Sequence, residues 1–416
     1  MKEKIHHLNF TLYFVLSLTV ITGFYFGEDS SGSGGFIADF NNTWPIMSVI
    51  DKGEFFDFSE YTIHFPLHYY ILFIINSLVD SKELVRLVFI FFSLFVPYLF
   101  FLILKEKFTN IGINKLFFFS QIIFLLPSFR SGAIWANTQI TALIFFMISL
   151  IYFIKWLNLK SYLINKKLIY QCFFLSLAVY SRQLYALIFI YILYIYFLKL
   201  DLKNFIKVCS IIFIFSLPGF FLVFTAPRTL TTTFDFNLIN SLVVNTSIIS
   251  FYLIPIFFIG WWNYLKNLNF SFFQKRDLLI ILFSFILVLF SSLNFSYNPS
   301  LGGGFFIKLS MIVFNNLIFF YLTSFLGIVF IIFLFKEDKK SMILFFLLVF
   351  GLSSYQIFQK YFEPMMIILL FSIIIFSQLN IILNDYKKII FLKFYFLIYL
   401  LLAIVNDIFK ITKSFL

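Results

Sequence analysis

Apolar runs of about 20 residues, separated by short polar segments, cover most of the chain. A helix of about 20 apolar residues crosses the ~30 Å hydrocarbon core of a bilayer. The first run covers about residues 9–26, and similar runs follow to the end of the sequence. The pattern therefore predicts an all-α, polytopic membrane protein with about 13 transmembrane helices. We expect residues 1–416 to form a single membrane domain.

Basic residues recur in alternate connections from residue 105 onward. These connections are residues 105–107, 155–167, 199–207, 266–276, 336–340 and 387–388. Because cytoplasmic loops carry an excess of Lys and Arg, they are predicted to be cytoplasmic, as is the N-terminal segment with Lys2 and Lys4. The polar interval 27–70 then lies outside, and an odd number of crossings must separate it from residues 105–107. We therefore predict that residues 64–79 dip in from the outer interface; a full crossing there would add one helix.

The interval 27–70, called the first outer loop below, is the one long polar stretch. It holds seven of the 19 acidic residues: Glu28, Asp29, Asp39, Asp51, Glu54, Asp57 and Glu60. Its Ser/Gly-rich residues 30–35 are typical of a flexible turn. An amphipathic piece follows at about residues 44–52, with Trp44, Ile46, Met47 and Ile50 on one face. A short helix with a tryptophan is expected to lie along the membrane interface.

Composition agrees with a membrane protein and excludes one class of partner. The chain is 62% hydrophobic and only 12% charged, against roughly 25% charged in soluble domains. The net charge of +12 is concentrated in short loops. A nucleic-acid site would need a basic face with interleaved polar residues, which is absent, so no nucleic-acid partner is expected. Cys172 and Cys209 lie within apolar runs and are expected to be packing residues.

Asp39 is the acid that we single out as a candidate for chemistry. It follows the Gly/Ser-rich residues and precedes the amphipathic piece, so it could point back over the outer end of the first helix. In a partly apolar cavity, the pKa of such a carboxyl group rises toward the range of a general base. The alternative is that Asp39 caps the following turn, where Asp is common. The same two interpretations, a general base or a turn cap, apply to Glu28 and Asp29.

Five basic residues lie on the outer side, where Lys and Arg should be depleted. They are Arg130, Arg182, Arg228, Lys308 and Lys360. Cations in apolar surroundings usually face a cavity or a partner, although their side chains can also extend to lipid head groups. Together with the acids, this set predicts a site for an anionic lipid head group, because Arg binds phosphate bidentately.

Metal chemistry and bound cofactors have little support in the sequence. His64 and His68 are four residues apart, but the segment lacks the glutamate of the zinc-protease motif, and Pro66 interrupts a helix. Gly302-Gly303-Gly304 is not followed by the Lys-Ser/Thr of a phosphate-binding loop. We therefore expect no metal and no cofactor.

Several segments appear in an order that resembles a known family. An acid follows the first helix, and a short interfacial piece precedes Tyr61–Tyr70 (YTIHFPLHYY) and the Glu83-x-x-Arg86 pair. Ser181–Tyr185 (SRQLY) and Gln359–Pro364 (QKYFEP) come later. In this order the chain resembles the GT-C superfamily of multi-span glycosyltransferases, which use polyprenyl-phosphate-linked sugars. The pattern is most similar to that of the α-1,2-glucosyltransferase that completes the lipid-linked N-glycan precursor.

The resemblance implies an inverting hexosyltransferase in which Asp39 is the general base. Because the acid stands alone in Ala38-Asp39-Phe40-Asn41, Glu28 and Asp29 are alternatives. The implied partners are a polyprenyl-phosphate-linked sugar donor, a glycan or lipid-linked acceptor, and membrane lipids. The residues expected to bind substrates are Glu28, Asp29, His64, Arg130, Arg182, Gln183, Arg228, Lys308, Lys360, Tyr361 and Glu363.

The expected location is a bacterial inner membrane, with the active site on the periplasmic face and a role in cell-envelope glycan biosynthesis. Two other functions stay open at this point. An O-antigen polymerase or ligase typically carries its large outer loop late in the chain, whereas here it comes first. A flippase or transporter of lipid-linked sugars predicts internal repeats with paired broken helices, and the sequence shows none.

Overall fold

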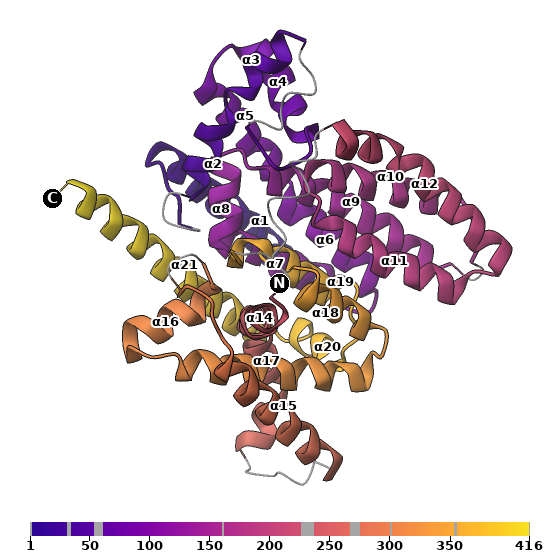
Figure 1. Cartoon of the computed structure of the whole chain (residues 1–416), viewed down its shortest axis with the longest axis vertical. Coiled ribbons are helices and arrows are strands. Elements are labelled where there is room, and N and C mark those ends of the chain that lie inside the picture. The colour runs from indigo at the N-terminus through magenta and orange to yellow at the C-terminus, as the bar shows by residue number, and fades with distance from the viewer. Residues whose placement is uncertain are drawn as a thin grey trace. The chain divides into compact units, whose positions relative to one another are not determined.

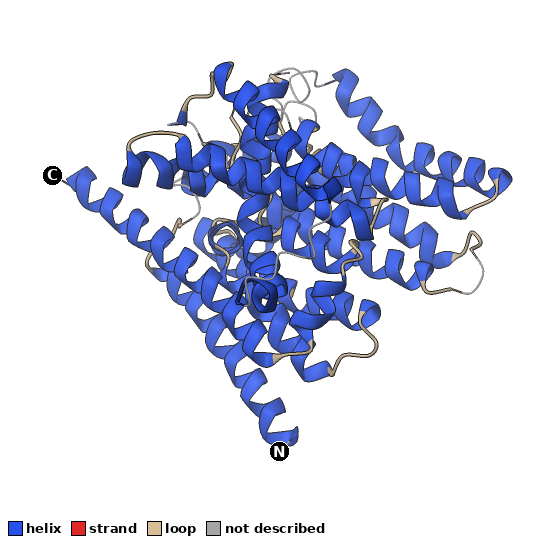
Figure 2. Ribbon diagram, turned by 90° about the horizontal axis from the view of Figure 1, so that it is seen from below, coloured by secondary structure: helices blue, strands red, loops and turns tan. Residues whose placement is uncertain are grey.

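Helices make up the regular structure of the chain. The computed structural model describes residues 2–30, 35–53, 61–159, 162–225, 237–266, 275–299, 302–352 and 356–415. Within these ranges every regular element is helical and no strand occurs (Figure 2). The all-α prediction is confirmed for this part of the chain.

The chain divides into two compact units, which are described separately. Unit 1 comprises Met1–Thr232 and Lys393–Leu416, and unit 2 comprises Thr233–Leu392. The helices of unit 1 are α1 (Lys2–Tyr25), α2 (Gly35–Thr43), α3 (Ile46–Asp51), α4 (Leu67–Val79), α5 (Lys82–Ser93), α6 (Val96–Lys107), α7 (Ile113–Ser120), η2 (Gln121–Leu125), α8 (Pro127–Ile134), α9 (Thr138–Leu157), α10 (Lys166–Ser181), α11 (Tyr185–Lys199) and α12 (Leu202–Thr225) (Figure 1).

Unit 2 is built from a second set of helices, which carry on the same labels in Figure 1. They are α14 (Leu238–Lys266), α15 (Lys275–Leu293), α16 (Gly304–Phe314), α17 (Ile318–Glu337), α18 (Ser341–Phe350), η4 (Gln359–Tyr361), α19 (Met365–Ser372) and α20 (Ser377–Leu383). The last helix, α21 (Tyr386–Phe415), begins in unit 2 and continues in unit 1. The prediction of a single membrane domain stays a prediction.

Several helices are long and apolar enough to cross a membrane. Among the described residues there are seven, or up to nine if each of two bent helix pairs forms one span. By length and composition the chain is therefore a multi-pass membrane protein. The predicted count of about 13 spans is not confirmed.

The segment 64–79 differs from these spans in length. Its helix, α4, has 13 residues, which is ~20 Å of helix against a hydrocarbon core of ~30 Å. Pro66 stands immediately before α4, where its missing N–H leaves no helical hydrogen bond unmade. That this segment dips in from the outer interface stays a prediction, and the length of α4 is compatible with it.

The basic connections seen in the sequence fall at helix ends. Residues 155–167 join α9 to α10, and residues 199–207 cover the junction of α11 and α12. Residues 266–276 span the end of α14 and the start of α15, and residues 336–340 lie between α17 and α18. That these helix ends face the cytoplasm, as the positive-inside rule predicts, stays a prediction.

Three buried polar side chains connect helices α9, α10 and α11 within unit 1. The helices α9, α10, α11 and α12 lie side by side in Figure 1. The Tyr196 hydroxyl of α11 donates to Gln171 Oε1 of α10 at 2.6 Å, and Gln171 Nε2 donates to Ser149 Oγ of α9 at 3.1 Å. All three side chains are buried. Hydrogen bonds of this kind hold helices together in apolar surroundings, where hydrophobic burial cannot.

Unit 1 also contains a broken helix pair. Residues 113–125 and 127–134 are bent by 70° at Pro127, where proline cannot continue the preceding helical hydrogen bonds. The bend directs the short helix α8 against α1 and α5. It thereby places Arg130 beside the end of the first helix.

In unit 2, helices α14 and α17 approach each other closely at small residues. A Cβ atom on Gly327 of α17 would overlap the carbonyl oxygen of Thr246 of α14. The Thr246 and Ser324 hydroxyls are 2.8 Å apart, as are those of Ser247 and Thr323. Small residues and hydroxyl hydrogen bonds are the usual basis of close packing between membrane helices.

A second bent pair in unit 2 is held by carboxylates. Helices α19 and α20 meet at 100°. Glu337 Oε2 accepts a hydrogen bond of 2.7 Å from the Ser377 N–H, and Asp338 Oδ2 accepts one of 3.1 Å from the Ile375 N–H. The acidic end of α17 thus binds backbone N–H groups at and just before the N-terminus of α20, where negative charge is favourable.

We expect Gly327→Ala to lower the free energy of unfolding by about 1–3 kcal/mol, because the new methyl group forces α14 and α17 apart. Thermal melting of the purified protein in detergent measures this. Gly35→Ala is the matched control, since no atom lies within 4 Å of a Cβ at that position. Equal melting temperatures for the two variants would contradict the close approach.

Candidate functional site

The structure distributes the predicted site residues over both units. Unit 1 holds Glu28, Asp29, Asp39, His64, Arg130, Arg182 and Gln183, and unit 2 holds Lys308, Lys360, Tyr361 and Glu363. Arg228 lies outside the described residues.

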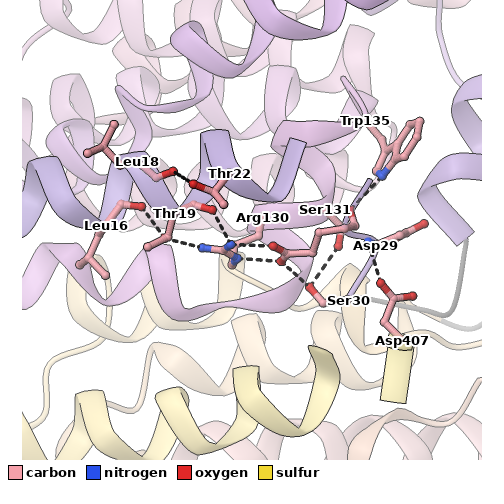
Figure 3. Close-up of polar contacts among 11 residues, drawn as sticks. Leu16, Leu18, Thr19, Thr22, Asp29, Ser30, Arg130, Ser131, Trp135 and Asp407 are labelled. Carbon is pink, nitrogen blue, oxygen red and sulfur yellow. Dashed lines mark hydrogen bonds and ion pairs between the residues drawn. The ribbon is translucent and has the colours of Figure 1, made fainter. Parts of the chain in front are cut away.

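Glu28 and Arg130 form a buried ion pair with each other. Arg130 Nε donates to Glu28 Oε1 at 2.7 Å, and Nη2 donates to Oε2 at 2.6 Å. Arg130 also donates to the hydroxyl and the carbonyl oxygen of Thr19 in α1, at 2.9 and 3.0 Å (Figure 3). The exposed fractions of the two side chains are only 5% and 10%. This bidentate geometry is the strongest form of such a pair, and it ties the first outer loop and α8 to α1.

Asp29 is fully buried and organises the start of α2. Its Oδ2 accepts a hydrogen bond of 2.9 Å from the N–H of Ile37, the third residue of α2. A carboxylate at this position satisfies a helical N–H that has no partner within the helix. The backbone N–H of Asp29 donates to Asp407 Oδ2 of α21 at 3.0 Å (Figure 3). This geometry gives Asp29 a structural role.

The first outer loop contains a helix that the sequence pattern did not predict. Residues 35–43 form α2, and Trp44-Pro45 separates it from α3. Asp39 lies in the middle of α2, so the alternative that it sits at a turn is wrong. Its side chain is exposed, whereas Phe36 and Phe40 of the same helix are buried. The structure thus leaves Asp39 at the surface of this helix.

The amphipathic piece forms α3 with most of the predicted apolar face, although Trp44 lies before the helix and is only half-buried. Ile46, Met47 and Ile50 are buried, and Val49 joins them. The helix packs against α4. Protein therefore covers the face that the sequence pattern assigned to the membrane interface.

Tyr69 of α4 is influenced by both the predicted acid and one of the predicted cations. Its hydroxyl is 2.9 Å from the Thr62 hydroxyl, and it also bonds to Thr43, one turn after Asp39 in α2. Burial raises the pKa of Tyr69 to about 12. The negative charge of Asp39 adds to the increase in pKa, and the positive charge of Arg182 opposes it. Both charged groups are therefore close enough to act on one hydroxyl. We call these five residues the Tyr69 cluster.

Two segments that carry the family-like motifs are in direct contact. Gln183 Nε2 donates to the carbonyl oxygen of Ile63 at 2.8 Å, and Gln183 Oε1 is 3.4 Å from His64 Nδ1. Arg182 lies between α10 and α11 and is buried; its Nη1 donates to Gln139 Oε1 at 3.3 Å. The structure thus joins Tyr61–Tyr70 to Ser181–Tyr185, although more than 100 residues separate His64 from Gln183.

His68 is buried, and its surroundings keep it neutral. One ring nitrogen, Nδ1, is 2.7 Å from the Thr141 hydroxyl, and the ring also bonds to the backbone of Ala136. Burial lowers the pKa of His68 from its ordinary value of 6.5 to about 3; the bond to Ala136 opposes this decrease, and the charge of His64 adds to it. His64 precedes α4 while His68 lies within it, so the two do not share a helix face.

The predicted residues of unit 2 lie in α16, in η4 and just after η4. The Phe305 N–H, in the first turn of α16, donates to Gln359 Oε1 at 2.7 Å. Lys308 is exposed on α16, and Lys360 is half-buried with its Nζ 5.3 Å from the centre of the Phe358 ring. Glu363 is buried and accepts a hydrogen bond of 3.3 Å from the Tyr252 hydroxyl. Tyr361 is half-buried beside them in η4.

Sequence reasoning did not assign roles to Thr43, Thr62, Tyr69 and Gln139. Thr62 and Tyr69 belong to the motif Tyr61–Tyr70, so the sequence singled out both positions but assigned a role to neither. Thr43 and Gln139 gave no signal, because their importance depends on contacts with distant residues. No group of three or more His, Cys, Asp and Glu residues in the described part of the chain could hold a metal ion.

The geometry of unit 1 can support proton transfer and anion binding. An exposed carboxylate can take a proton from an alcohol, and a guanidinium nearby can stabilise negative charge that develops in the reaction. No protein-family model, curated protein or solved structure matches this chain.

We expect Glu28→Gln to lower the free energy of unfolding by about 3–5 kcal/mol, because it leaves the Arg130 guanidinium buried without its counter-charge. Thermal melting in detergent measures this. Glu106→Gln is the control, since Glu106 and Lys155 form a more exposed pair at 3.5 Å whose loss should cost under about 1 kcal/mol. Similar effects in both variants would show that the Glu28–Arg130 pair is not buried as described.

We expect the protein to lose stability as the pH falls below about 6.5. In the unfolded state His68 binds a proton in this range, whereas in the folded state its pKa is about 3, so protonation favours unfolding. The loss amounts to about 2 kcal/mol between pH 6.5 and roughly pH 5. Melting curves at several pH values measure this for the wild type and for His68→Asn, which should show a flatter dependence. His7→Asn, at an exposed position in α1, should retain the full pH dependence.

Proposed function

We propose that the protein is an integral-membrane glycosyltransferase of the GT-C type. It transfers a hexose from a polyprenyl-phosphate donor to a glycan or lipid-linked acceptor on the outer face of a bacterial inner membrane. One observation carries this proposal. The two motif segments that the family resemblance singles out, Tyr61–Tyr70 and Ser181–Tyr185, are hydrogen-bonded to each other beside the helix that bears the predicted acid.

In the proposed reaction Asp39 is the general base. Its carboxylate takes the proton from an acceptor hydroxyl, and the oxygen of that hydroxyl forms a bond to the anomeric carbon of the donor sugar. The bond between this carbon and the phosphate oxygen breaks, and the polyprenyl phosphate leaves with the electron pair. Attack from the side opposite to the phosphate inverts the anomeric configuration.

Asp39 suits this role better than the two acids considered beside it. Glu28 is paired with Arg130, and Asp29 is buried as the cap of α2. Proton transfer from an acceptor hydroxyl requires a carboxylate that the acceptor can reach. Asp39 is exposed, which favours it over the other two.

The cations supply the second half of the proposed mechanism. Charge on the departing phosphate is best stabilised by groups that are already in place before the bond breaks. Arg182, held by Gln139 in unit 1, is such a group. Arg130 is less suitable, because its guanidinium already binds Glu28 and Thr19.

The test uses purified protein in proteoliposomes with a panel of labelled undecaprenyl-phosphate hexoses and lipid-linked acceptors from the host membrane. We expect Asp39→Asn to lower the rate of hexose transfer by about 10²–10⁴-fold, which is the contribution of a positioned general base. Asp201→Asn is the control, since Asp201 is also exposed and lies at the start of α12. Transfer at the wild-type rate in Asp39→Asn would refute the role of Asp39. Movement of the donor across the bilayer without any transfer would instead identify a flippase.

A further inference from the structure

Arg86 of α5 is among the most enclosed charged groups in unit 1, and the proposed chemistry gives it no part. Only 5% of the residue is exposed. Its Nε donates to the carbonyl oxygen of Ile134 at 3.0 Å, and its Nη1 donates to Glu83 Oε2 at 2.7 Å. Its third nitrogen, Nη2, is buried and has no hydrogen-bond partner.

Aromatic rings surround the guanidinium. Its central carbon lies 3.6 Å from the centre of the Trp135 ring, 4.8 Å from that of Phe24 and 5.9 Å from that of Phe40. The Glu83 side chain is 65% exposed, so water screens much of its attraction for Arg86. The rings, which exclude water, are therefore the main environment of the charge.

Lys82, one turn before Arg86 in α5, is a second cation that contacts α2. Lys82 Nζ lies 5.1 Å from the centre of the Phe40 ring and 5.5 Å from that of Trp44, and it donates to Asn41 Oδ1 at 2.8 Å. Lys82 and Arg86 are four residues apart, so they project from one face of α5. Together they hold Phe40 of α2 by two cation–π contacts.

Lys82 and Arg86 contact the side of α2 that carries Phe40, whereas Asp39 lies on a different side of this helix. Asp39 and Thr43 are four residues apart and share the side of α2 that faces Tyr69. Phe40 is turned by ~100° from Asp39 around the helix axis. Since α2 has only nine residues, it cannot rely on its own hydrogen bonds for stability. Contacts with neighbouring helices must therefore fix its rotation.

We propose that Arg86, assisted by Lys82, is a positioning residue that fixes the rotation of α2 and thereby directs Asp39 toward Tyr69 and the substrate. This inference rests on the proposed function only for its catalytic consequence. The structural part, that contacts from α5 hold α2 in place, can be tested without measuring enzymatic activity.

The first measurement is amide hydrogen exchange in detergent or nanodiscs. In Arg86→Met, which keeps the apolar volume but removes the charge, we expect exchange of the α2 amides to become at least about 10-fold faster. Amides of α9 should keep their wild-type protection. Phe40→Leu removes the α2 half of the same contact and should give the same result, which covers the case in which Arg86→Met fails to fold.

The second measurement is the kinetics of hexose transfer. We expect Arg86→Met to lower kcat by about 10²-fold, as misplacement of a reacting group by ~1 Å can do, while KM changes little. Arg86→Lys should restore part of the loss, because it returns the charge over Trp135 without the guanidinium geometry. Glu83→Gln should be close to the wild type, since it removes only the exposed ion pair. Lys336→Met, which removes a cation–π contact with Phe333 in unit 2, is the matched control.

The outcomes separate the two proposals. Unchanged exchange of the α2 amides in both Arg86→Met and Phe40→Leu would overturn the positioning role, whatever the activity. Faster exchange with an unchanged kcat would also overturn it, because α2 would then move without consequence for the reaction. Absence of transfer in the wild type would refute the proposed function alone, and the exchange result would still decide whether Arg86 holds α2.

Discussion

A charged or polar side chain inside an apolar helical bundle must find a partner, and the polar geometry of unit 1 follows from this requirement. Arg130 meets it with the Glu28 carboxylate and two oxygens of Thr19. Arg86 meets it in another way, with two hydrogen bonds and the faces of aromatic rings. Asp39 differs from both because it stays at the surface of its helix. The fold thus separates buried charges that connect helices from an acidic group that is exposed at the surface.

The helical part of the fold could be predicted from the sequence because it depends on local composition. Apolar runs predict helices, and the apolar residues on either side of Arg182 form α10 and α11, with the arginine between them. The helix α2 was missed for the same reason. Glycine and serine at its start are typical of a turn, and the spacing of Phe36 and Phe40, the one helical signal, is significant only if other elements bury them.

The candidate site was predictable only in part. The sequence identified Glu28 and Arg130 as charges near the outer end of the bundle, but it could not show that they bind each other across 102 residues. It identified the segments around His64 and Gln183 as motifs, whereas the hydrogen bond between them depends on how α4 and α10 pack. Tyr69 was hidden for a related reason, since a tyrosine beside apolar residues is more often part of a core than of a site.

The bond between the Asp29 N–H and the Asp407 carboxylate joins points 378 residues apart. During synthesis the ribosome releases residues in order, so the stretch around Asp29 reaches the membrane long before residue 407 exists. The cap of α2 can adopt its final hydrogen bonding only after α21 has been inserted. Assembly of the start of α2 is therefore among the last events in the biogenesis of the protein, and a chain that ends before α21 lacks one of the hydrogen bonds of Asp29.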